Sequence, residues 1–205
     1  MGTEITGEAK YRRASYRVSL HLDSKTLTLR DELKLSIPLK DVRQAVPKDG
    51  QLTIAWNDDK IVLHVGPQSE RLAKKILSPP TLLEKLGIKP NSAVSVVGLD
   101  DKPFLEDLRQ RAGSVTDGRA KPQSDIIIVR VDGRAGLGRL KTLRRSLKSD
   151  GMIWVLWRKG LQGPNDVKES DVIAAAKTYG LVDVKVASFS EELSALKLVI
   201  PVALR

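Results

Sequence analysis

The chain of 205 residues has no cysteine, only two histidines and no long apolar run. Without cysteine, the sequence excludes disulfides, thiolate nucleophiles, zinc fingers and iron–sulfur clusters. A membrane-spanning helix needs roughly 18–20 consecutive apolar residues, and no stretch of the sequence approaches that length. The first ten residues are polar and include two acids, which excludes a signal peptide. We therefore expect a cytoplasmic protein.

The remaining composition is that of an ordinary globular protein. Hydrophobic residues make up 41% and charged residues 29% of the chain, which excludes wholesale disorder. A length of 205 residues allows one large domain or two small ones. We expect residues 1–14 to be flexible, because no regular apolar pattern begins before Ser15.

Between Ser15 and Gly66, apolar and polar residues alternate with period two, which is typical of half-buried antiparallel strands. Asp49-Gly50 and Asn57-Asp58-Asp59 supply turns. From Pro67 the period becomes helical, and Pro79-Pro80 ends the helix. Residues 15–78 thus form a small β domain with one C-terminal helix. Through Ile37-Pro38-Leu39-Lys40-Asp41-Val42 and the strand after it, this domain resembles the pleckstrin-homology-like fold.

Residues 79–90 read as a linker with a short helix, and residues 91–205 as an α/β domain. Ala93–Val97, Asp125–Val131 and Met152–Trp157 are apolar runs typical of buried parallel strands. A leucine stripe follows the second run and predicts a helix ending at Asp150-Gly151. Two alternating segments around Ser190-Glu191-Glu192 predict a closing antiparallel hairpin. The expected fold is α/β: a mostly parallel sheet that ends in an antiparallel hairpin.

This order of elements is similar to the C-terminal part of the Rossmann-like methyltransferase fold. The chain looks like a member of an uncharacterised bacterial family of methyltransferase-like domains, over about residues 74–205. Four segments carry the resemblance: Ser78–Pro90, Trp154–Lys159, Gly180–Val186 and Ser194–Lys197. The family is known by sequence and not by reaction, so the resemblance implies a fold and no established activity.

A methyltransferase of this fold binds S-adenosylmethionine at a glycine-rich turn after its first strand, and an acid ending the second strand takes the ribose hydroxyls. The candidate residues here are Gly98, Asp100 and Asp117. Only one glycine stands at this turn, and we expect Leu99 to present its side chain toward the ligand. The stretch from Phe104 to Asp125 is too short for a complete second and third strand. These departures favour a reduced, non-catalytic descendant that uses no cofactor. Asp117 has an alternative reading as an ordinary turn residue.

A second glycine cluster lies between a buried strand and a helix. A strand–glycine–helix turn can aim backbone N–H groups and the positive end of a helix at a phosphate, and arginines can clamp an anion with two hydrogen bonds. The cluster matches neither the dinucleotide motif nor the P-loop, and a flexible connection is the simpler interpretation. The candidate anion-binding residues are Arg134, Gly136, Gly138, Arg139, Arg144 and Arg145.

Positive charge is concentrated in the same region. Residues 119–148 contain nine Lys and Arg against two Asp, in a chain of net charge +10. If residues 134–148 form one helix, its basic side could attract an anionic ligand, an acidic protein or a nucleic acid. Only eight aromatic residues are present and most lie in core-like patterns, which argues against a base-stacking surface. A solvated basic face is the simplest alternative.

No residue pattern indicates catalysis. The sequence has no nucleophile elbow, His-Glu-x-x-His or Ser-x-x-Lys motif, and we predict no catalytic residues. His21 and His64 lie on the polar faces of their strands without the further ligands that a metal site needs. The favoured interpretation is a non-enzymatic binding or regulatory protein for an anionic ligand or acidic partner. The alternatives are a divergent S-adenosylmethionine-dependent methyltransferase and a non-specific nucleic-acid binder.

Overall fold

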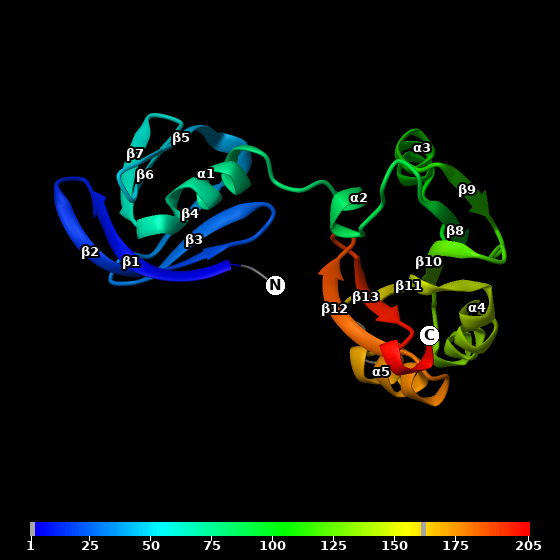
Figure 1. The fold of residues 1–205 in the computed structure, drawn as a ribbon. Helices are drawn as coiled ribbons and strands as arrows, with labels where there is room; N and C mark the ends of the chain where they lie inside the picture. The colour runs from blue at the N-terminus through cyan, green and yellow to red at the C-terminus, as the bar shows by residue number, and fades with distance from the viewer. Residues whose placement is uncertain (1–2, 161–162) are drawn as a thin grey trace. The chain divides into compact units, whose positions relative to one another are not determined.

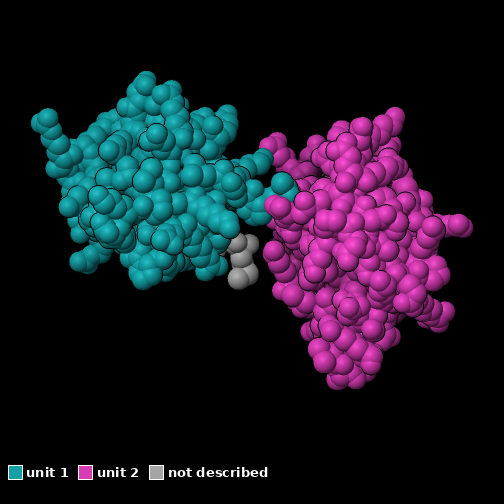
Figure 2. Space-filling view, turned by 45° about the horizontal axis from the view of Figure 1, so that its top comes forward, with its two compact units in different colours: residues 1–81 teal, residues 82–205 magenta. Residues whose placement is uncertain are grey.

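The computed structural model describes residues 3–160 and 163–205, which form two compact units (Figure 2). The first unit spans residues 1–81 and the second spans residues 82–205. Each unit has its own β-sheet (Figure 1). Each unit also buries its own hydrophobic residues. The division after Thr81 follows four exposed residues, 78–81, that include Pro79-Pro80.

The sheet of the first unit has the strand order β4-β3-β2-β1-β7-β6-β5, and its neighbours are antiparallel. The α-helix α1 (Ser69–Leu77) follows the last strand and packs on β5 and β6, burying Leu72 and Ile76. An antiparallel sheet followed by one helix agrees with the sequence pattern. The likeness to the pleckstrin-homology-like fold stays a prediction. The elements are β1 (Thr3–Tyr11), β2 (Ala14–Leu22), β3 (Thr26–Asp31), β4 (Leu35–Pro38), β5 (Val42–Lys48), β6 (Gln51–Trp56), β7 (Asp59–His64) and the 3₁₀ turns η1 (Leu39–Asp41) and η2 (Gly66–Gln68).

The prediction of a flexible segment over residues 1–14 is wrong for residues 3–11, and residues 1–2 lie outside the described residues. Residues 3–11 form β1, which pairs with β2 along its whole length and with β7 through residues 8–10. Among residues 4–11 of this strand, only Ile5 and Ala9 are buried, so its side chains give a weak periodic signal. The strand is ordered because of backbone hydrogen bonds to neighbouring strands, and a side-chain pattern does not indicate these bonds.

The second unit has a six-stranded mixed sheet with the order β12-β13-β11-β10-β8-β9. The strands β9, β8, β10 and β11 are parallel, and β13 and β12 complete the sheet as an antiparallel hairpin, as the sequence predicts. The elements are α2 (Leu82–Lys85), β8 (Ala93–Val97), α3 (Lys102–Arg111), β9 (Ser114–Asp117), β10 (Ser124–Arg130), η3 (Arg134–Arg139), α4 (Leu140–Ser146), β11 (Leu147–Arg158), α5 (Glu169–Thr178), β12 (Val182–Ser188), β13 (Leu193–Val199) and η4 (Val202–Leu204).

Both faces of this sheet are covered, which explains the unbroken apolar run in β10. Ile126 and Ile128 belong to a core with α3, whereas Ile127 and Val129 belong to a core with α4 and α5. Successive side chains of a strand point to opposite faces, so a strand covered on both sides must be apolar at every position.

Two boundaries differ from those predicted. The segment 82–90 is part of the second unit and not a linker, because Leu86 and Ile88 are buried in its core and Trp154 Nε1 donates a hydrogen bond of 2.9 Å to the Leu86 carbonyl. The predicted helix over residues 134–148 is confirmed only in part, because it ends at Ser146 and its first six residues are 3₁₀ and not α. The chain forms the 3₁₀ turn η3 and then α4, and at Leu147 it enters β11.

Among residues 3–160 and 163–205, no helix is both long enough and apolar enough to cross a membrane.

Candidate anion-binding site

The carboxyl ends of β8 and β9 bring two of the predicted cofactor residues to the same edge of the sheet. Gly98 follows β8 directly and has a φ of +70°, a left-handed conformation that favours glycine. Asp117 is the last residue of β9, and its Cα pairs with that of Val96. The strand that carries Asp117 is therefore present although it is only four residues long. No third strand lies between β9 and β10, so the sheet is shortened as predicted.

The third cofactor candidate, Asp100, comes two residues after Gly98. It is exposed and lines a shallow cavity of about 490 Å³ together with Arg130 and Glu192. Neither Gly98 nor Asp117 lines that cavity. The next residue, Asp101, caps α3 by accepting a hydrogen bond of 3.0 Å from the Phe104 amide.

A guanidinium group lies beside the turn after β8. A Cβ atom added at Gly98 would lie 3.7 Å from Arg139 Nη1 and 3.4 Å from the Arg130 carbonyl oxygen. Leu99, which we expected to face a ligand, is instead 5% exposed and packs in the core with Phe104. Because like charges repel, Arg139 disfavours a cationic group next to Gly98 and favours an anionic one.

Two groups of the predicted glycine cluster already have partners within the fold. Arg134 pairs with Asp171 at 3.3 Å, and its backbone N–H donates to the Asn165 carbonyl at 3.2 Å. The Gly136 amide donates to the Gly133 carbonyl at 2.9 Å, so it is used within η3. The space where a Gly138 side chain would lie is open. Among the predicted residues of η3, Arg139 is the one that keeps a cation at the carboxyl edge.

The other two predicted arginines, Arg144 and Arg145, lie at the far end of α4, next to the start of β11. Here they line a cavity of about 480 Å³, which also involves the end of α5. The lining has three cations and no carboxylate or imidazole. It comprises Lys141, Arg144, Arg145, Thr178, Tyr179, Gly180 and Ile200. We call this the basic cavity.

Gly180 shapes the basic cavity through close contact with Arg144. It ends α5 with a φ of +67°, and its amide donates to the Lys177 carbonyl at 3.1 Å. A Cβ atom added there would lie 3.3 Å from Arg144 Cζ and 3.4 Å from both terminal nitrogens. These nearly equal distances mean that the guanidinium lies flat over the glycine. A side chain at this position would be strained by the φ and would displace the guanidinium by a few tenths of an ångström, so both features favour glycine.

The cations of the basic cavity are available for a ligand. In the part of the chain that the structure describes, none of Lys141, Arg144 and Arg145 forms an ion pair with a carboxylate. Arg144 is half-buried, so its charge is less screened than that of a fully exposed arginine. Sequence reasoning found Arg144 and Arg145 but missed Lys141, Tyr179 and Gly180. A glycine at a helix end predicts a C-cap, and nothing in the sequence links it to an arginine 36 positions earlier.

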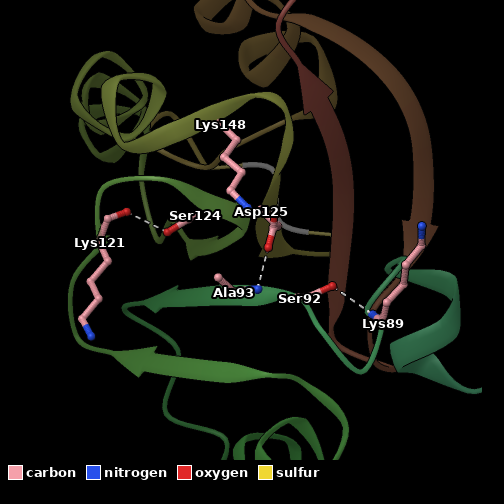
Figure 3. A network of polar contacts seen from close by, with 7 residues as sticks. All are labelled: Lys89, Ser92, Ala93, Lys121, Ser124, Asp125 and Lys148. Atoms are coloured by element: carbon pink, nitrogen blue, oxygen red, sulfur yellow. Dashed lines mark hydrogen bonds and ion pairs between the residues drawn. The ribbon is translucent and has the colours of Figure 1, made fainter.

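A polar network joins the amino ends of β8, β10 and β11, at the edge of the sheet opposite to Gly98 and Asp117 (Figure 3). Asp125 accepts hydrogen bonds from the Ala93 amide at 2.7 Å and from Lys148 Nζ at 2.5 Å. Ser124 bonds the Ser95 hydroxyl at 2.8 Å and donates to the Lys121 carbonyl at 2.7 Å. The charge of Lys148 is thus used inside the fold, which removes it from the set of basic residues that could bind a ligand.

The electrostatics of Asp125 agree with this structural role. Burial raises the pKa of the Asp125 carboxyl. The hydrogen bonds from Ala93 and Lys148 and the positive charge of Lys148 together lower the pKa by more than burial raises it, so that it lies below the ordinary value of 3.8. Asp125 is therefore an anion at neutral pH and compensates Lys148.

Metal coordination has no support in residues 3–160 and 163–205, where no group of three or more His, Asp or Glu side chains is arranged to hold an ion. His21 and His64 both lie in the first unit, on β2 and β7.

Comparison with known proteins gives a family and several partly similar structures. The family model described as "Protein of unknown function (DUF3052)" matches residues 83–202. No curated protein sequence matches the chain. A SAM dependent methyltransferase from Aquifex aeolicus is 16% identical, with a TM-score of 0.45 over 59% of this chain and 88% of that one. A putative type 11 methyltransferase from Sulfolobus solfataricus is also 16% identical, with a TM-score of 0.45 over 58% and 89%. Magnesium protoporphyrin IX methyltransferase from Synechocystis PCC 6803, solved with bound SAH, is 10% identical, with a TM-score of 0.44 over 58% and 78%.

Proposed function

The chain belongs to the family described as "Protein of unknown function (DUF3052)", and we propose that its second unit binds an anionic ligand in the basic cavity. The observation that carries this proposal is the half-buried Arg144 guanidinium, laid flat on Gly180 in a cavity with three cations and no carboxylate. A planar guanidinium offers several N–H donors in a fixed fork that matches phosphate or carboxylate oxygens.

The ligand class follows from the lining. Lys141 and Arg145 add two further charges, and the Tyr179 phenol can donate a hydrogen bond to an oxygen acceptor. The Thr178 hydroxyl donates to the Ala174 carbonyl at 3.0 Å, so it can offer a ligand only an acceptor. The cavity volume lies within the range of about 300–1,000 Å³ that small-molecule sites usually have. A phosphorylated small molecule therefore fits better than an extended polymer. The lining is cationic and offers hydrogen-bond donors, and the role proposed for it is binding or regulation.

Calorimetric titration of the full chain with inorganic pyrophosphate tests this proposal. Arg144→Ala is expected to weaken binding by at least about tenfold, because charge-assisted hydrogen bonds contribute roughly 1.5–3 kcal/mol each. Gly180→Ala keeps every charge but pushes a methyl group against the guanidinium, and it is expected to weaken binding as well. Arg144→Lys keeps the charge without the planar fork, and should bind less tightly than the wild type.

Arg109→Ala is the matched control. Arg109 is exposed on α3 and outside the basic cavity, and its removal changes the net charge by the same amount. Equal losses in Arg144→Ala and Arg109→Ala would mean that only overall charge attracts pyrophosphate. The proposal would then be wrong, as it would be if millimolar pyrophosphate gave no heat with the wild type.

A second candidate is a divergent S-adenosylmethionine-dependent methyltransferase at the carboxyl edge. Its support is the placement of Asp117 at the end of β9, beside the strand that leads to Gly98, where the acid of a Rossmann-like site takes ribose hydroxyls. Asp117 fits that role. Arg139 does not fit a cationic sulfonium beside Gly98. Because of this conflict, we rank anion binding in the basic cavity above methyltransferase function.

Titration with S-adenosylmethionine and S-adenosylhomocysteine separates the two candidates. Methyltransferase function predicts micromolar binding of both compounds that Asp117→Ala abolishes and Arg144→Ala leaves unchanged. If neither compound gives heat or a thermal shift at millimolar concentration, the methyltransferase candidate is rejected and anion binding is untouched.

A further inference from the structure

The first unit has a cavity that neither function uses. It has a volume of about 710 Å³ and lies among the β2–β3 turn, the η1 turn and the end of α1. Its apolar walls include Pro38, Leu39, Val42, Ile76 and Leu77. The only charged lining residues are Lys25 and Lys40. We call this the first-unit pocket.

The walls of the first-unit pocket are held in place by backbone hydrogen bonds. The Asp23 carboxylate accepts from the Lys25 amide at 2.7 Å and from the Thr26 amide at 2.8 Å, which fixes the β2–β3 turn. The Leu39 amide donates to the Lys25 carbonyl at 2.8 Å and so joins this turn to η1. A pocket whose walls are already fixed loses little conformational freedom when a ligand enters.

The floor of the pocket is apolar and part of its wall faces solvent. Leu39 and Ile76 are 8% and 2% exposed and belong to the core of the unit, so they form a continuous apolar floor. Leu77, next along α1, is 53% exposed although it lines the same pocket. Covering Leu77 with an aliphatic group would remove apolar surface from water, which is favourable.

The charges of the pocket restrict what can cover this surface. Lys40 is exposed on η1 and lines the pocket together with Lys25, whereas no lining residue is an acid. A neutral apolar molecule would make no use of the charge of Lys40, and a purely polar anion would leave the apolar walls in water. The complementary ligand has an aliphatic body and one anionic end.

We propose that the first-unit pocket binds a small amphiphilic carboxylate, with its chain on Leu77, Val42 and Ile76 and its carboxylate at Lys40. The pocket volume lies within the usual range for small-molecule sites, about 300–1,000 Å³. This site is separate from the basic cavity, so either proposal can fail without the other.

The test is a titration of the full-length, ¹⁵N-labelled protein with octanoate, followed by the amide chemical shifts. Shifts are expected for the backbone amides of Lys40, Val42 and Leu77, with weaker shifts or none for acetate, which lacks the chain, and for octanol, which lacks the charge. Leu77→Gln is expected to weaken octanoate binding about tenfold through lost apolar contact. Lys40→Ala should weaken octanoate and leave the weak octanol binding unchanged.

Two control variants distinguish binding in the first-unit pocket from non-specific binding to exposed apolar or charged side chains. Val46→Gln removes a side chain that is 51% exposed on β5 outside the pocket, and Lys34→Ala removes an exposed charge outside it. Neither should change octanoate binding. The proposal is overturned if octanol binds as tightly as octanoate, or if the chemical shifts change elsewhere in the chain. It is also overturned if Val46→Gln weakens octanoate binding as much as Leu77→Gln, or Lys34→Ala as much as Lys40→Ala.

Discussion

Asp125 shows how one side chain can fix the order of three strands. It is the second residue of β10, accepts a hydrogen bond from the first residue of β8 and binds Lys148 on β11. These contacts come from positions 32 and 23 residues away. In the sequence, Asp125 is only the polar residue before an apolar run. In the structure, its carboxylate links β10 to β8 and β11 at the amino edge of the sheet.

We predict that Asp125→Asn lowers the free energy of unfolding at pH 7 by about 1–2 kcal/mol, because it removes a partly exposed charge-assisted pair. The folded pKa of Asp125 lies below its ordinary value of 3.8, so the carboxylate stabilises the fold above that value and loses this effect as the pH falls below it. Urea unfolding at pH 7 and pH 3, followed by tryptophan fluorescence, should therefore show a difference from wild type that shrinks in acid.

Asp150→Asn is the matched control for this prediction. Asp150 is an exposed carboxylate on the same strand as Lys148, and no side-chain contact is found for it among the described residues. A loss of stability in Asp150→Asn equal to that in Asp125→Asn would show that overall charge, and not the network of Figure 3, is responsible.

At the scale of elements, the segment from η3 to β11 is decided by competition between helix and sheet. Leu137, Leu140, Leu143 and Leu147 favour one continuous helix, but a spacing of three also suits a 3₁₀ turn. Leu147 pairs instead with Ser124, so the helix ends where the parallel strand begins. As a result, Arg139 lies near the carboxyl edge and Arg144 near the amino edge. The basic residues from Arg134 to Arg145 therefore lie on a 3₁₀ turn followed by an α-helix, and Lys148 lies on β11.

At the scale of the whole molecule, each unit buries its own core. Leu20 is fully buried in the first unit, and Leu196 is 1% exposed in the second. We predict two transitions in calorimetric unfolding, because no core cluster contains residues of both units. Leu20→Ala should destabilise the first unit by about 2–5 kcal/mol and move only one transition, and Leu196→Ala should move only the other. A single transition that both substitutions shift equally would contradict this prediction.

The sequence by itself determined the elements whose signal is local. Period-two alternation predicted the strands from Ser15 to His64, and continuous apolar runs predicted β8, β10 and the buried part of β11. The turn around Ser190–Glu192 predicted the closing hairpin. In these places the side-chain pattern and the backbone structure have the same short range, so local reasoning is sufficient.

Only the tertiary structure decided which distant residues meet. The ordered conformation of β1 depends on backbone pairing with β2 and β7, and Arg134 pairs with Asp171, 37 positions later in the sequence. Arg144 reached the basic cavity because Gly180 leaves room for its guanidinium. Such contacts depend on strand order and on space left by missing side chains, which hydrophobic periodicity does not encode.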